Sequence, residues 1–243
     1  MDTWLERTAL MFSPDAIARL QSLRILVVGV GGVGAYAAEM LVRAGVGHLT
    51  IVDADTVSPS NINRQLIALH STVGRPKVDV LADRLRDINP ALDIRTIAEY
   101  LRDERTIEVL ESDTFDYVVD AIDTLAPKVF LIAQAYERGI PVVSSMGSGG
   151  KIDPSQVRID DISRSDYCKL ARMVRKRLHR LGIRRGITVV YSPEVVPPER
   201  MVLTQGEQNK KSNVGTISYM PALFGIHIAS HIIRSVTEGL TSV

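Results

Sequence analysis

Four glycines that follow a strand-like run mark the first place in the sequence where chemistry can be located. The run RILVVG leads into the pattern GxGxxG, formed by Gly29, Gly31, Gly32 and Gly34, and an alanine-rich helical stretch comes next. Such a turn lets the backbone approach a phosphate, and the following helix presents free N–H groups and the positive end of its dipole. The pattern predicts a nucleotide site.

An acidic residue lies at the end of the next strand-like run, HLTIVD. Asp53 comes about 20 residues after the glycine pattern, the usual spacing for a carboxylate that accepts hydrogen bonds from ribose hydroxyls. NAD and ATP both satisfy this pattern. A nicotinamide dehydrogenase and an ATP-dependent enzyme therefore remain open at this point.

Two cations further along, Arg64 and Lys77, favour ATP chemistry. Hydride transfer gains little from cations near the nucleotide phosphates. A carboxylate that attacks an α-phosphate brings two anions together, and at about 4 Å their repulsion is several kcal/mol in a partly dry cleft. Fixed cations would offset it. The alternative interpretation places each cation on a solvated helix face.

Three carboxylates complete the candidate site. Asp123 follows the apolar run YVVDAI, at the carboxyl end of a strand where ligands collect in open sheets, so it is well placed for a metal ion. Asp120, inside the run, is expected to play a buried hydrogen-bonding role. Asp55 is expected to support the loop that carries Arg64.

The composition limits the broad class of the protein. The chain has 243 residues, of which 45% are hydrophobic and 23% charged, which suggests one large domain or one domain with an appended subdomain. Lys and Arg number 29 against 28 Asp and Glu, so the molecule as a whole is not polybasic. The single cysteine, Cys168, excludes an intramolecular disulfide and a four-thiolate zinc site, and favours a reducing compartment.

Short β-branched runs that alternate with helical segments predict an α/β fold with a doubly wound, mostly parallel sheet. We expect helices in residues 1–23, with Leu10, Ile17 and Leu20 against the sheet, and a Rossmann-like ATP-binding core in 24–146. Residues 147–243 are expected to extend the sheet in antiparallel fashion within the same compact unit. The predicted elements there are strands at QVRIDDI and ITVVYS, a helix over 166–181 and a final apolar helix.

Four motifs carry a resemblance to a known family. GVGGVG, DADTVSPSNINRQ, RPK and DAIDT together resemble the ubiquitin-activating superfamily of adenylating enzymes, which includes the activators of molybdopterin and thiamine sulfur carriers. The resemblance spans about residues 7–150. It implies that Gly32 lies against the phosphates and Asp53 binds the ribose, and that the triphosphate is contacted by Ser60, Asn61, Arg64 and Lys77.

The same resemblance implies roles for further residues and partners. Asp123 would coordinate Mg²⁺ beside the α-phosphate, with Thr124 adjacent and Asp55 in a supporting place. Arg7 resembles an N-terminal arginine that reaches into the site of a neighbouring protomer. The expected cofactors are ATP and Mg²⁺, and the expected assembly is a homodimer.

The cysteine content bears on what is adenylated. Sulfur-carrier activators of this superfamily typically hold zinc through two CxxC pairs, and this chain has neither. Adenylation of the C-terminus of a ubiquitin-like sulfur carrier is therefore weakened, although it remains the alternative function, and a sulfur relay or carrier partner stays open.

A basic segment occupies that region of the chain. Residues 169–185 contain no acid and eight cations: Lys169, Arg172, Arg175, Lys176, Arg177, Arg180, Arg184 and Arg185. This distribution predicts a polyanionic partner that contacts one helix through its phosphates. The other face of that helix is expected to pack through Leu170, Met173, Val174, Leu178 and Leu181.

Three further strings narrow the resemblance. LARMVRKRL, GITVVYSPE and QNKKSNVGTISYMP resemble the tRNA threonylcarbamoyladenosine dehydratases, a branch of the same superfamily, over nearly the whole chain. This implies a cytoplasmic enzyme that activates the threonine carboxylate of a modified adenosine in tRNA with ATP and then closes a ring. Lys210 and Lys211 are expected to contact tRNA or the carboxylate.

The C-terminal apolar stretch needs a separate interpretation. Residues 214–233 carry no charge and reach the minimum length of a membrane span, but small and polar residues interrupt them. We therefore expect a buried or dimer-forming helix and no stable membrane insertion. His227 and His231 are expected to be structural rather than metal ligands.

Overall fold

The computed structural model describes residues 3–203 and 212–238, and it confirms the doubly wound sheet. Seven strands lie in the order β3-β2-β1-β4-β5-β7-β6. Their bounds are β1 Arg24–Val28, β2 His48–Val52, β3 Asp93–Ile97, β4 Tyr117–Asp120, β5 Val142–Ser145, β6 Arg158–Asp161 and β7 Thr188–Tyr191. A separate two-stranded sheet joins β8 (Met201–Leu203) to β9 (Ser212–Val214).

The strands after residue 146 were predicted to extend the sheet in antiparallel fashion, which holds for the edge strand β6 but not for β7. Neighbouring strands from β3 to β7 are parallel, and only the β6–β7 pair of this sheet is antiparallel. The antiparallel continuation is therefore confirmed for β6, whereas β7 runs parallel to β5. The chain reaches this arrangement by placing β6 outside β7, with α7 lying between them in sequence.

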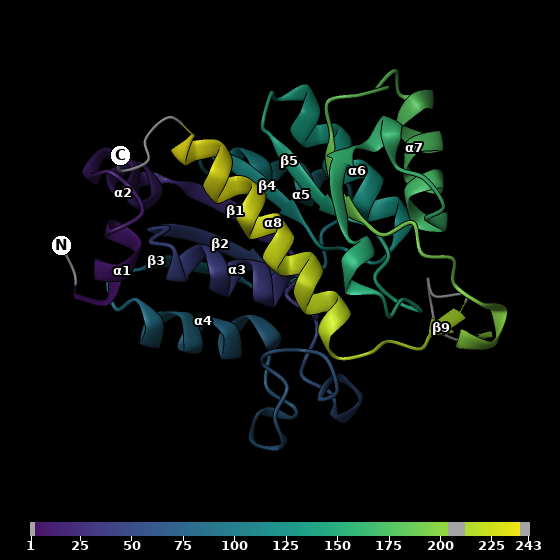
Figure 1. Cartoon of the computed structure of the whole chain (residues 1–243), viewed down its shortest axis with the longest axis horizontal. Helices are drawn as coiled ribbons and strands as arrows, with labels where there is room; N and C mark the ends of the chain where they lie inside the picture. The colour runs from purple at the N-terminus through teal and green to yellow at the C-terminus, as the bar shows by residue number, and fades with distance from the viewer. Residues whose placement is uncertain (1–2, 204–211, 239–243) are drawn as a thin grey trace.

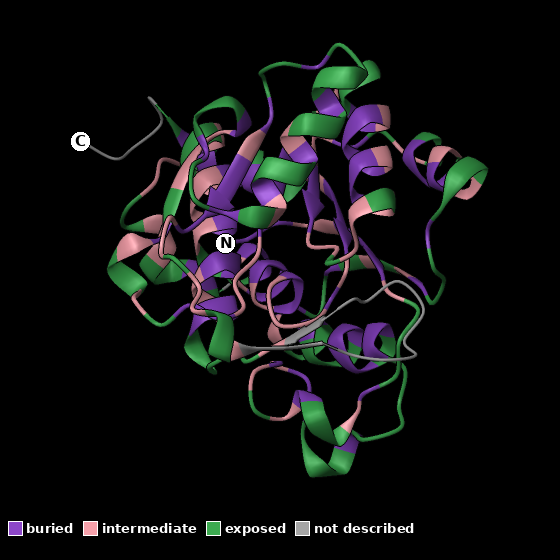
Figure 2. Cartoon of the chain, turned by 90° about the vertical axis from the view of Figure 1, so that its right-hand side faces the viewer, coloured by how far each residue is buried: buried purple, intermediate pink, exposed green. Residues whose placement is uncertain are grey.

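Helices cover both faces of the sheet because its strands are apolar on both sides (Figures 1 and 2). In β1, Ile25 and Val27 join one buried cluster, and Leu26 and Val28 join the other. The first cluster includes residues of α2 (Pro14–Ser22), α3 (Gly34–Arg43), α4 (Lys77–Ile88) and α8 (Tyr219–Thr237). The second includes residues of α5 (Asp103–Glu111), α6 (Leu125–Glu137) and α7 (Lys169–Arg180).

The N-terminal segment forms two helices, α1 (Glu6–Ala9) and α2. Ser13 caps α2 by accepting a hydrogen bond from the amide of Ala16, and Ile17 and Leu20 are buried as predicted. The expectation for Leu10 was wrong, since its side chain is 81% exposed. Leu10 follows the end of α1 and lies outside the helical face that the spacing assumed.

The apolar helix α8 packs on α3 and on the glycine turn that precedes it (Figure 1). A Cβ atom on Gly225 would lie 2.4 Å from the carbonyl oxygen of Val33, and one on Gly32 would lie 3.0 Å from the Cβ of Pro221. Glycine at position 225 therefore allows the two backbones to approach closely. In the described part of the chain, no helix is long and apolar enough to cross a membrane.

Candidate nucleotide site and basic helix

The glycine turn has the geometry of a phosphate cradle. Gly29 adopts a φ of +88°, and a Cβ there would lie 2.8 Å from the carbonyl oxygen of Ala121. A Cβ on Gly34 would lie 1.8 Å from the carbonyl oxygen of Gly29. Side chains are thus excluded at both ends of the turn, and no side chain caps the N-terminus of α3. The amide of Ala35 donates to the Gly31 carbonyl, and the backbone of the turn with the positive end of the α3 dipole remains open to an anion.

The turn lies at the topological switch point of the sheet. After β1 the chain builds β2 and β3 on one side, and it then returns to place β4 and β5 on the other. The carboxyl ends of β1 and β4 meet where Ala121 touches Gly29. In open α/β sheets this crevice is where ligands bind.

Asp53 connects the end of β2 to the glycine turn. One carboxylate oxygen accepts a hydrogen bond from the amide of Val30 at 2.8 Å, and the other accepts one from the amide of Asp55 at 2.9 Å. Burial raises the pKa of Asp53, and the nearby positive charge of Lys77 partly offsets that effect. The same carboxylate that was predicted to bind ribose also fixes the turn.

Lys77 is the first residue of α4 and is 4% exposed. Its Nζ lies 2.7 Å from a carboxylate oxygen of Asp55, and its amide donates to the Asp55 carbonyl at 3.0 Å. Asp55 thus holds Lys77, and beside the bridge between Thr56 and Pro76 this pair joins the two ends of the loop that carries Arg64. The solvated-face interpretation of Lys77 is wrong, since the side chain is buried.

Arg64 lies in the turn after Pro59–Asn61, and its guanidinium folds over that turn. It donates to the Ser60 carbonyl and to the Asn63 side chain, both at 2.8 Å. Asn61 is 9% exposed and accepts a hydrogen bond from the amide of Ser58. Three residues predicted to contact the triphosphate, Ser60, Asn61 and Arg64, thus lie on one loop. Asn61 shapes the turn, and the Ser60 side chain is exposed.

Asp123 and Thr124 follow β4 as predicted. Asp123 is exposed, and it lies two residues beyond the alanine that touches Gly29. Thr124 is the residue before α6, and its hydroxyl lies 3.4 Å from that of Tyr100. Within the described residues, no group of three or more His, Cys, Asp or Glu side chains could hold a metal ion by itself.

A buried ion pair under this loop was only half predicted. Asp120 and Lys128 are both 0% exposed, and the lysine Nζ lies 2.6 Å from the carboxylate. The Ser144 hydroxyl also donates to the same oxygen of Asp120. The other carboxylate oxygen of Asp120 accepts a hydrogen bond from the amide of Ile122. The buried role expected for Asp120 is confirmed. Lys128 was missed, although a lysine inside the apolar helix LAPKVFLIA was a signal for it.

Two further buried polar residues were missed. Gln65 is 9% exposed, and its Oε1 is buried without a hydrogen-bond partner within the described residues. Its Nε2 faces Gly31. The position of Gln65 directly after Arg64 was the sequence signal that could have indicated it. Lys151 donates to the carbonyls of Ser192 and Glu194, and burial lowers its pKa. It joins the segment after β5 to the segment after β7.

Arg7 lies away from the rest of this set. It is an exposed residue of α1. The neighbouring Leu5 is buried against Gly45, beyond the C-terminus of α3, whereas the glycine turn lies before its N-terminus. A helix of ten residues is about 15 Å long. The structure therefore does not bring Arg7 to the glycine turn of its own chain.

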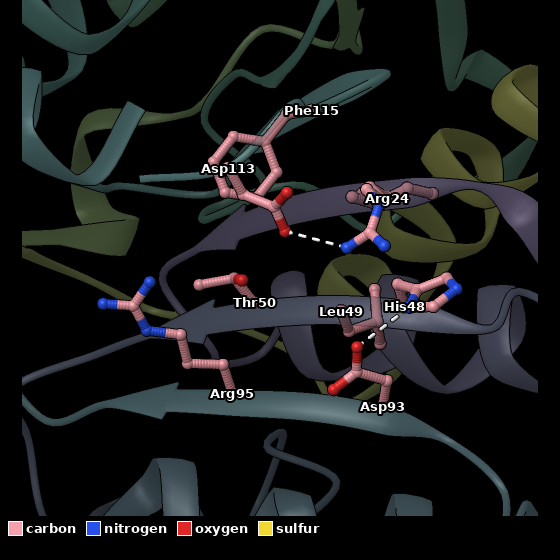
Figure 3. A pocket seen from close by; sticks show the side chains of 9 residues that line it. Arg24, His48, Leu49, Thr50, Asp93, Arg95, Asp113 and Phe115 are labelled. Atoms are coloured by element: carbon pink, nitrogen blue, oxygen red, sulfur yellow. Dashed lines mark hydrogen bonds and ion pairs between the residues drawn. The ribbon is translucent and has the colours of Figure 1, made fainter. Parts of the chain in front are cut away.

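A cavity of about 170 Å³ lies at the amino ends of the parallel strands, away from the carboxyl ends that carry the glycine turn (Figure 3). Its lining includes the first residues of three parallel strands, Arg24, His48 and Asp93. Arg24 pairs with Asp113 at 3.1 Å, and His48 Nδ1 lies 3.0 Å from Asp93. These groups satisfy each other at the amino ends of the strands, so this cavity is separate from the nucleotide crevice.

Helix α7 lies on the side of the molecule that Figure 2 turns toward the viewer, and much of it is exposed. Of the eight cations in residues 169–185, six lie on α7, whereas Arg184 and Arg185 follow its end, so the expectation that one helix carries them all was wrong. Seven of the eight are exposed, and none of these seven has an ion pair within the described residues. Arg175 differs, because its guanidinium donates to the carbonyl of Ile162 and to the carbonyl and hydroxyl of Ser165. We therefore assign Arg175 to the internal structure.

The packing face of α7 is narrower than predicted. Ala171, Val174 and Leu178 are buried, but Met173 and Leu181 are 51% and 57% exposed. The expectation for Met173 and Leu181 was wrong because α7 packs mainly on α6 through a narrow face, and Leu181 lies beyond the last residue of the helix. The predicted contacts of Lys210 and Lys211 lie outside the described residues.

Comparison with known proteins identifies the family. The model of the ThiF family matches residues 5–241. The chain belongs to the ThiF family. The tRNA threonylcarbamoyladenosine dehydratase of Bacillus subtilis is 35% identical to this chain over 241 residues, and the match covers 96% of this chain and 94% of that protein.

A solved structure and a second relative define the likeness further. The crystal structure of the Escherichia coli tRNA N6-threonylcarbamoyladenosine dehydratase in complex with ATP has a TM-score of 0.85 and 33% identity, and covers 97% of this chain and 96% of that one. The Escherichia coli molybdopterin-synthase adenylyltransferase is 38% identical, but the match covers 55% of this chain and 53% of that protein. The likeness to the dehydratases therefore includes the region of α7 and α8.

Proposed function

We propose that this protein is an ATP-dependent adenylating enzyme that dehydrates N6-threonylcarbamoyladenosine in tRNA. The observation that carries the proposal is the juxtaposition, at the switch point, of an open phosphate cradle with the buried cation Lys77 and with Asp123. The near full-length likeness to named dehydratases supports the substrate.

The chemistry follows from making a poor leaving group into a good one. The threonine carboxylate attacks the α-phosphorus of ATP, the bond to the β-phosphate breaks and pyrophosphate leaves. The ureido nitrogen then attacks the acyl carbon, loses its proton and displaces AMP, which closes a five-membered ring. Lys77 and Arg64 offset the repulsion between the two anions in the first step. Gly32 and its neighbours hold the phosphates, and Asp53 holds the ribose.

Mg²⁺ fits this site as a partner of the nucleotide. Magnesium in ATP-dependent enzymes is commonly bound by one or two carboxylates together with phosphate oxygens and waters. Asp123 offers one exposed carboxylate at the carboxyl end of β4, with Thr124 next to it. The metal would reduce the negative charge that the incoming carboxylate meets.

The tRNA substrate would lie across the C-terminal part of the chain. We assign nucleotide binding to residues 24–146 and RNA contact to 147–243, through the exposed cations of α7 that have no ion pair within the described residues. A free buried Cys168 and a tRNA substrate both fit an enzyme of the cytoplasm.

A homodimer would place Arg7 in the site of the other subunit. Leu10 and Met11, close to Arg7, are 81% and 65% exposed, which supports a contact between copies at this end. Mixing Arg7→Ala and Lys77→Ala subunits tests the arrangement, because one site of a mixed dimer would keep both residues. Turnover should reappear in the mixture. Two inactive variants that stay inactive after subunit exchange would contradict an arginine acting in trans.

Mass analysis of nucleosides tests the main proposal. Enzyme, ATP and Mg²⁺ are incubated with tRNA that carries N6-threonylcarbamoyladenosine, and the modified nucleoside should lose the mass of one water while ATP yields AMP and pyrophosphate. Asp123→Asn and a reaction without ATP serve as controls. Pyrophosphate exchange that depends on a small ubiquitin-like protein and not on tRNA would instead establish the carrier-activating alternative.

A further inference from the structure

Tyr167 is an exposed aromatic residue in a constrained backbone conformation. Its side chain is 76% exposed, and its φ is +48°, a region that residues other than glycine seldom adopt. It lies two residues before the first residue of α7. Such a conformation costs free energy and persists only where the neighbouring structure enforces it.

The residues on both sides of Tyr167 are anchored. Ser165 is 4% exposed, donates from its hydroxyl to the Ile162 carbonyl at 2.7 Å, and receives hydrogen bonds from Arg175. Cys168 is 6% exposed, and its amide donates to the Asp166 carbonyl at 2.6 Å. The ring of Tyr167 is therefore held out from a fixed turn, so little ordering is needed for it to bind a partner.

The helix that begins two residues after Tyr167 carries exposed cations. Lys169, Arg172 and Lys176 are exposed, recur at spacings of three and four, and have no ion pair within the described residues. Met173, which is 51% exposed, lies among them. An aromatic face beside a row of unpaired cations combines the two contacts that single-stranded nucleic acid makes, stacking of bases and neutralisation of phosphates.

The position of the turn relates it to the nucleotide crevice. The side chain of Leu170, in the first turn of α7, lies 3.9 Å from where a Cβ on Gly147 would be. Gly147 follows β5, and β5 lies beside β4, whose carboxyl end leads to Asp123. Tyr167 thus stands near the same edge of the sheet as the candidate site, one strand further along.

We propose that Tyr167 is a stacking platform for an unpaired base of an RNA loop, whose phosphates contact the cations of α7. The inference rests on the proposed function for its RNA substrate and extends it to the way in which that RNA is recognised. Single-stranded loops are where proteins read RNA, because their bases can leave the stack and lie on aromatic side chains.

A tryptophan reporter tests the contact directly. Trp4 is the only tryptophan of the chain, so Trp4→Phe with Tyr167→Trp leaves one indole at the proposed platform. An RNA hairpin with an unpaired loop should quench its fluorescence. A blunt RNA duplex with the same number of phosphates should bind with little quenching. Equal quenching by both RNAs, or by neither, would overturn the stacking contact.

Affinity and salt dependence provide the second test. Tyr167→Ala should weaken binding of the hairpin about 5- to 100-fold, within the range for loss of one stacked base, and should leave the slope of affinity against salt unchanged. Tyr167→Phe should retain binding, and Tyr136→Ala, at another exposed tyrosine, should have no effect. Wild-type affinity in Tyr167→Ala, or a change in its salt slope equal to that of Arg172→Ala, would contradict the proposal.

Two controls separate this inference from its rivals. Vesicles rich in phosphatidylserine should not change the fluorescence of the indole at position 167, and a blue shift with vesicles but no response to RNA would mean a membrane surface instead. Loop binding that depends on Tyr167, without conversion of the tRNA nucleoside, would support the platform and defeat the proposed function. Conversion of limiting tRNA by Tyr167→Ala as efficiently as by wild type would support the proposed function and defeat the platform.

Discussion

The glycine turn region and the α7 surface hold their cations in opposite ways. Near the turn, Lys77 is buried on Asp55, and Arg64 is folded onto the carbonyl of Ser60. On α7, the exposed cations have no ion pair within the described residues. A site that must stabilise charge at one atom needs donors fixed beforehand. A surface that gathers a long polyanion gains from cations that remain hydrated and adaptable.

This difference predicts how each region responds to substitution and to salt. Loss of a fixed donor should remove turnover and spare RNA binding, because the geometry of the crevice cannot be replaced by its neighbours. Loss of a surface cation should weaken RNA binding in steps, because each phosphate contact contributes separately. The following experiments test the contrast, from the largest effect to the smallest.

Lys77→Ala should lower turnover of tRNA by about 100-fold or more, the usual cost of one preorganised electrostatic donor. Binding of tRNA should stay within about twofold of wild type. Single-turnover kinetics and filter binding measure the two quantities. The matched control is Arg75→Ala. Arg75 lies two residues before Lys77, is exposed and pairs with Asp83, so this variant should keep normal turnover. Unchanged turnover in Lys77→Ala would remove the nucleotide assignment.

Gly34→Ala should lower the free energy of unfolding by about 3 kcal/mol or more, because its Cβ would meet the Gly29 carbonyl at 1.8 Å and backbone cannot easily yield. Urea unfolding measures the change. Gly147→Ala, close to α7, is the control, since its nearest neighbour would be 3.9 Å away. Equal stability of the two variants would show that the turn is no more rigid than the surface near α7.

Arg172→Glu with Arg177→Glu should weaken tRNA binding about tenfold or more, and should reduce the slope of log affinity against log salt by about 0.7 for each lost phosphate contact. Titrations at several salt concentrations give both values. Arg19→Glu with Arg86→Glu reverses two exposed cations elsewhere and should preserve the slope. An unchanged slope in the α7 variant would relocate the RNA surface.

Glu39→Gln should have the smallest effect, about 1 kcal/mol of stability at pH 7. Burial acts to raise the pKa of Glu39, but hydrogen bonds from Arg84 and Arg43 outweigh it and hold the pKa below its ordinary value of 4.5. The folded state thus releases this proton more easily than the unfolded chain, so the stabilisation is present above pH 4.5 and is lost as the pH falls through the lower folded value.

Urea unfolding at neutral and acidic pH measures the pH dependence of this effect. Wild type and Glu39→Gln should differ at pH 7 and converge in acid, whereas Glu104→Gln, an exposed carboxylate on α5, should match wild type throughout. A difference that persists in acid would assign the role of Glu39 to packing and not to its charge.

The nucleotide half was predictable from sequence because its signals are local. The order of strand, glycine turn and helix is written in consecutive residues, and so is the position of Asp123 after an apolar run. The partner of Asp55 was not predictable in this way. Asp55 meets Lys77 only because an isolated bridge between Thr56 and Pro76 closes the intervening loop, and no local pattern announces that closure.

The C-terminal half was less predictable because its burial depends on neighbours. Met173 and Leu181 have helical spacing but remain exposed, and Arg175 looks like its neighbours in sequence but is used internally. One strand of the nucleotide half, β3, also gave no clear signal, because it lies at the edge of the sheet and most of its residues are exposed or half-buried. In each case the neighbours that the fold supplies, and not the residue type, decide whether the side chain is buried.

The packing of α8 against the glycine turn also sets an order of events during synthesis. The ribosome makes the glycine turn early, while Pro221 and Gly225, which pack against one side of it, emerge much later. Chains fold from the N-terminus as they are made. A nascent chain therefore lacks this wall of the glycine turn until the distant helix arrives, and a chain that stops before residue 221 never forms it.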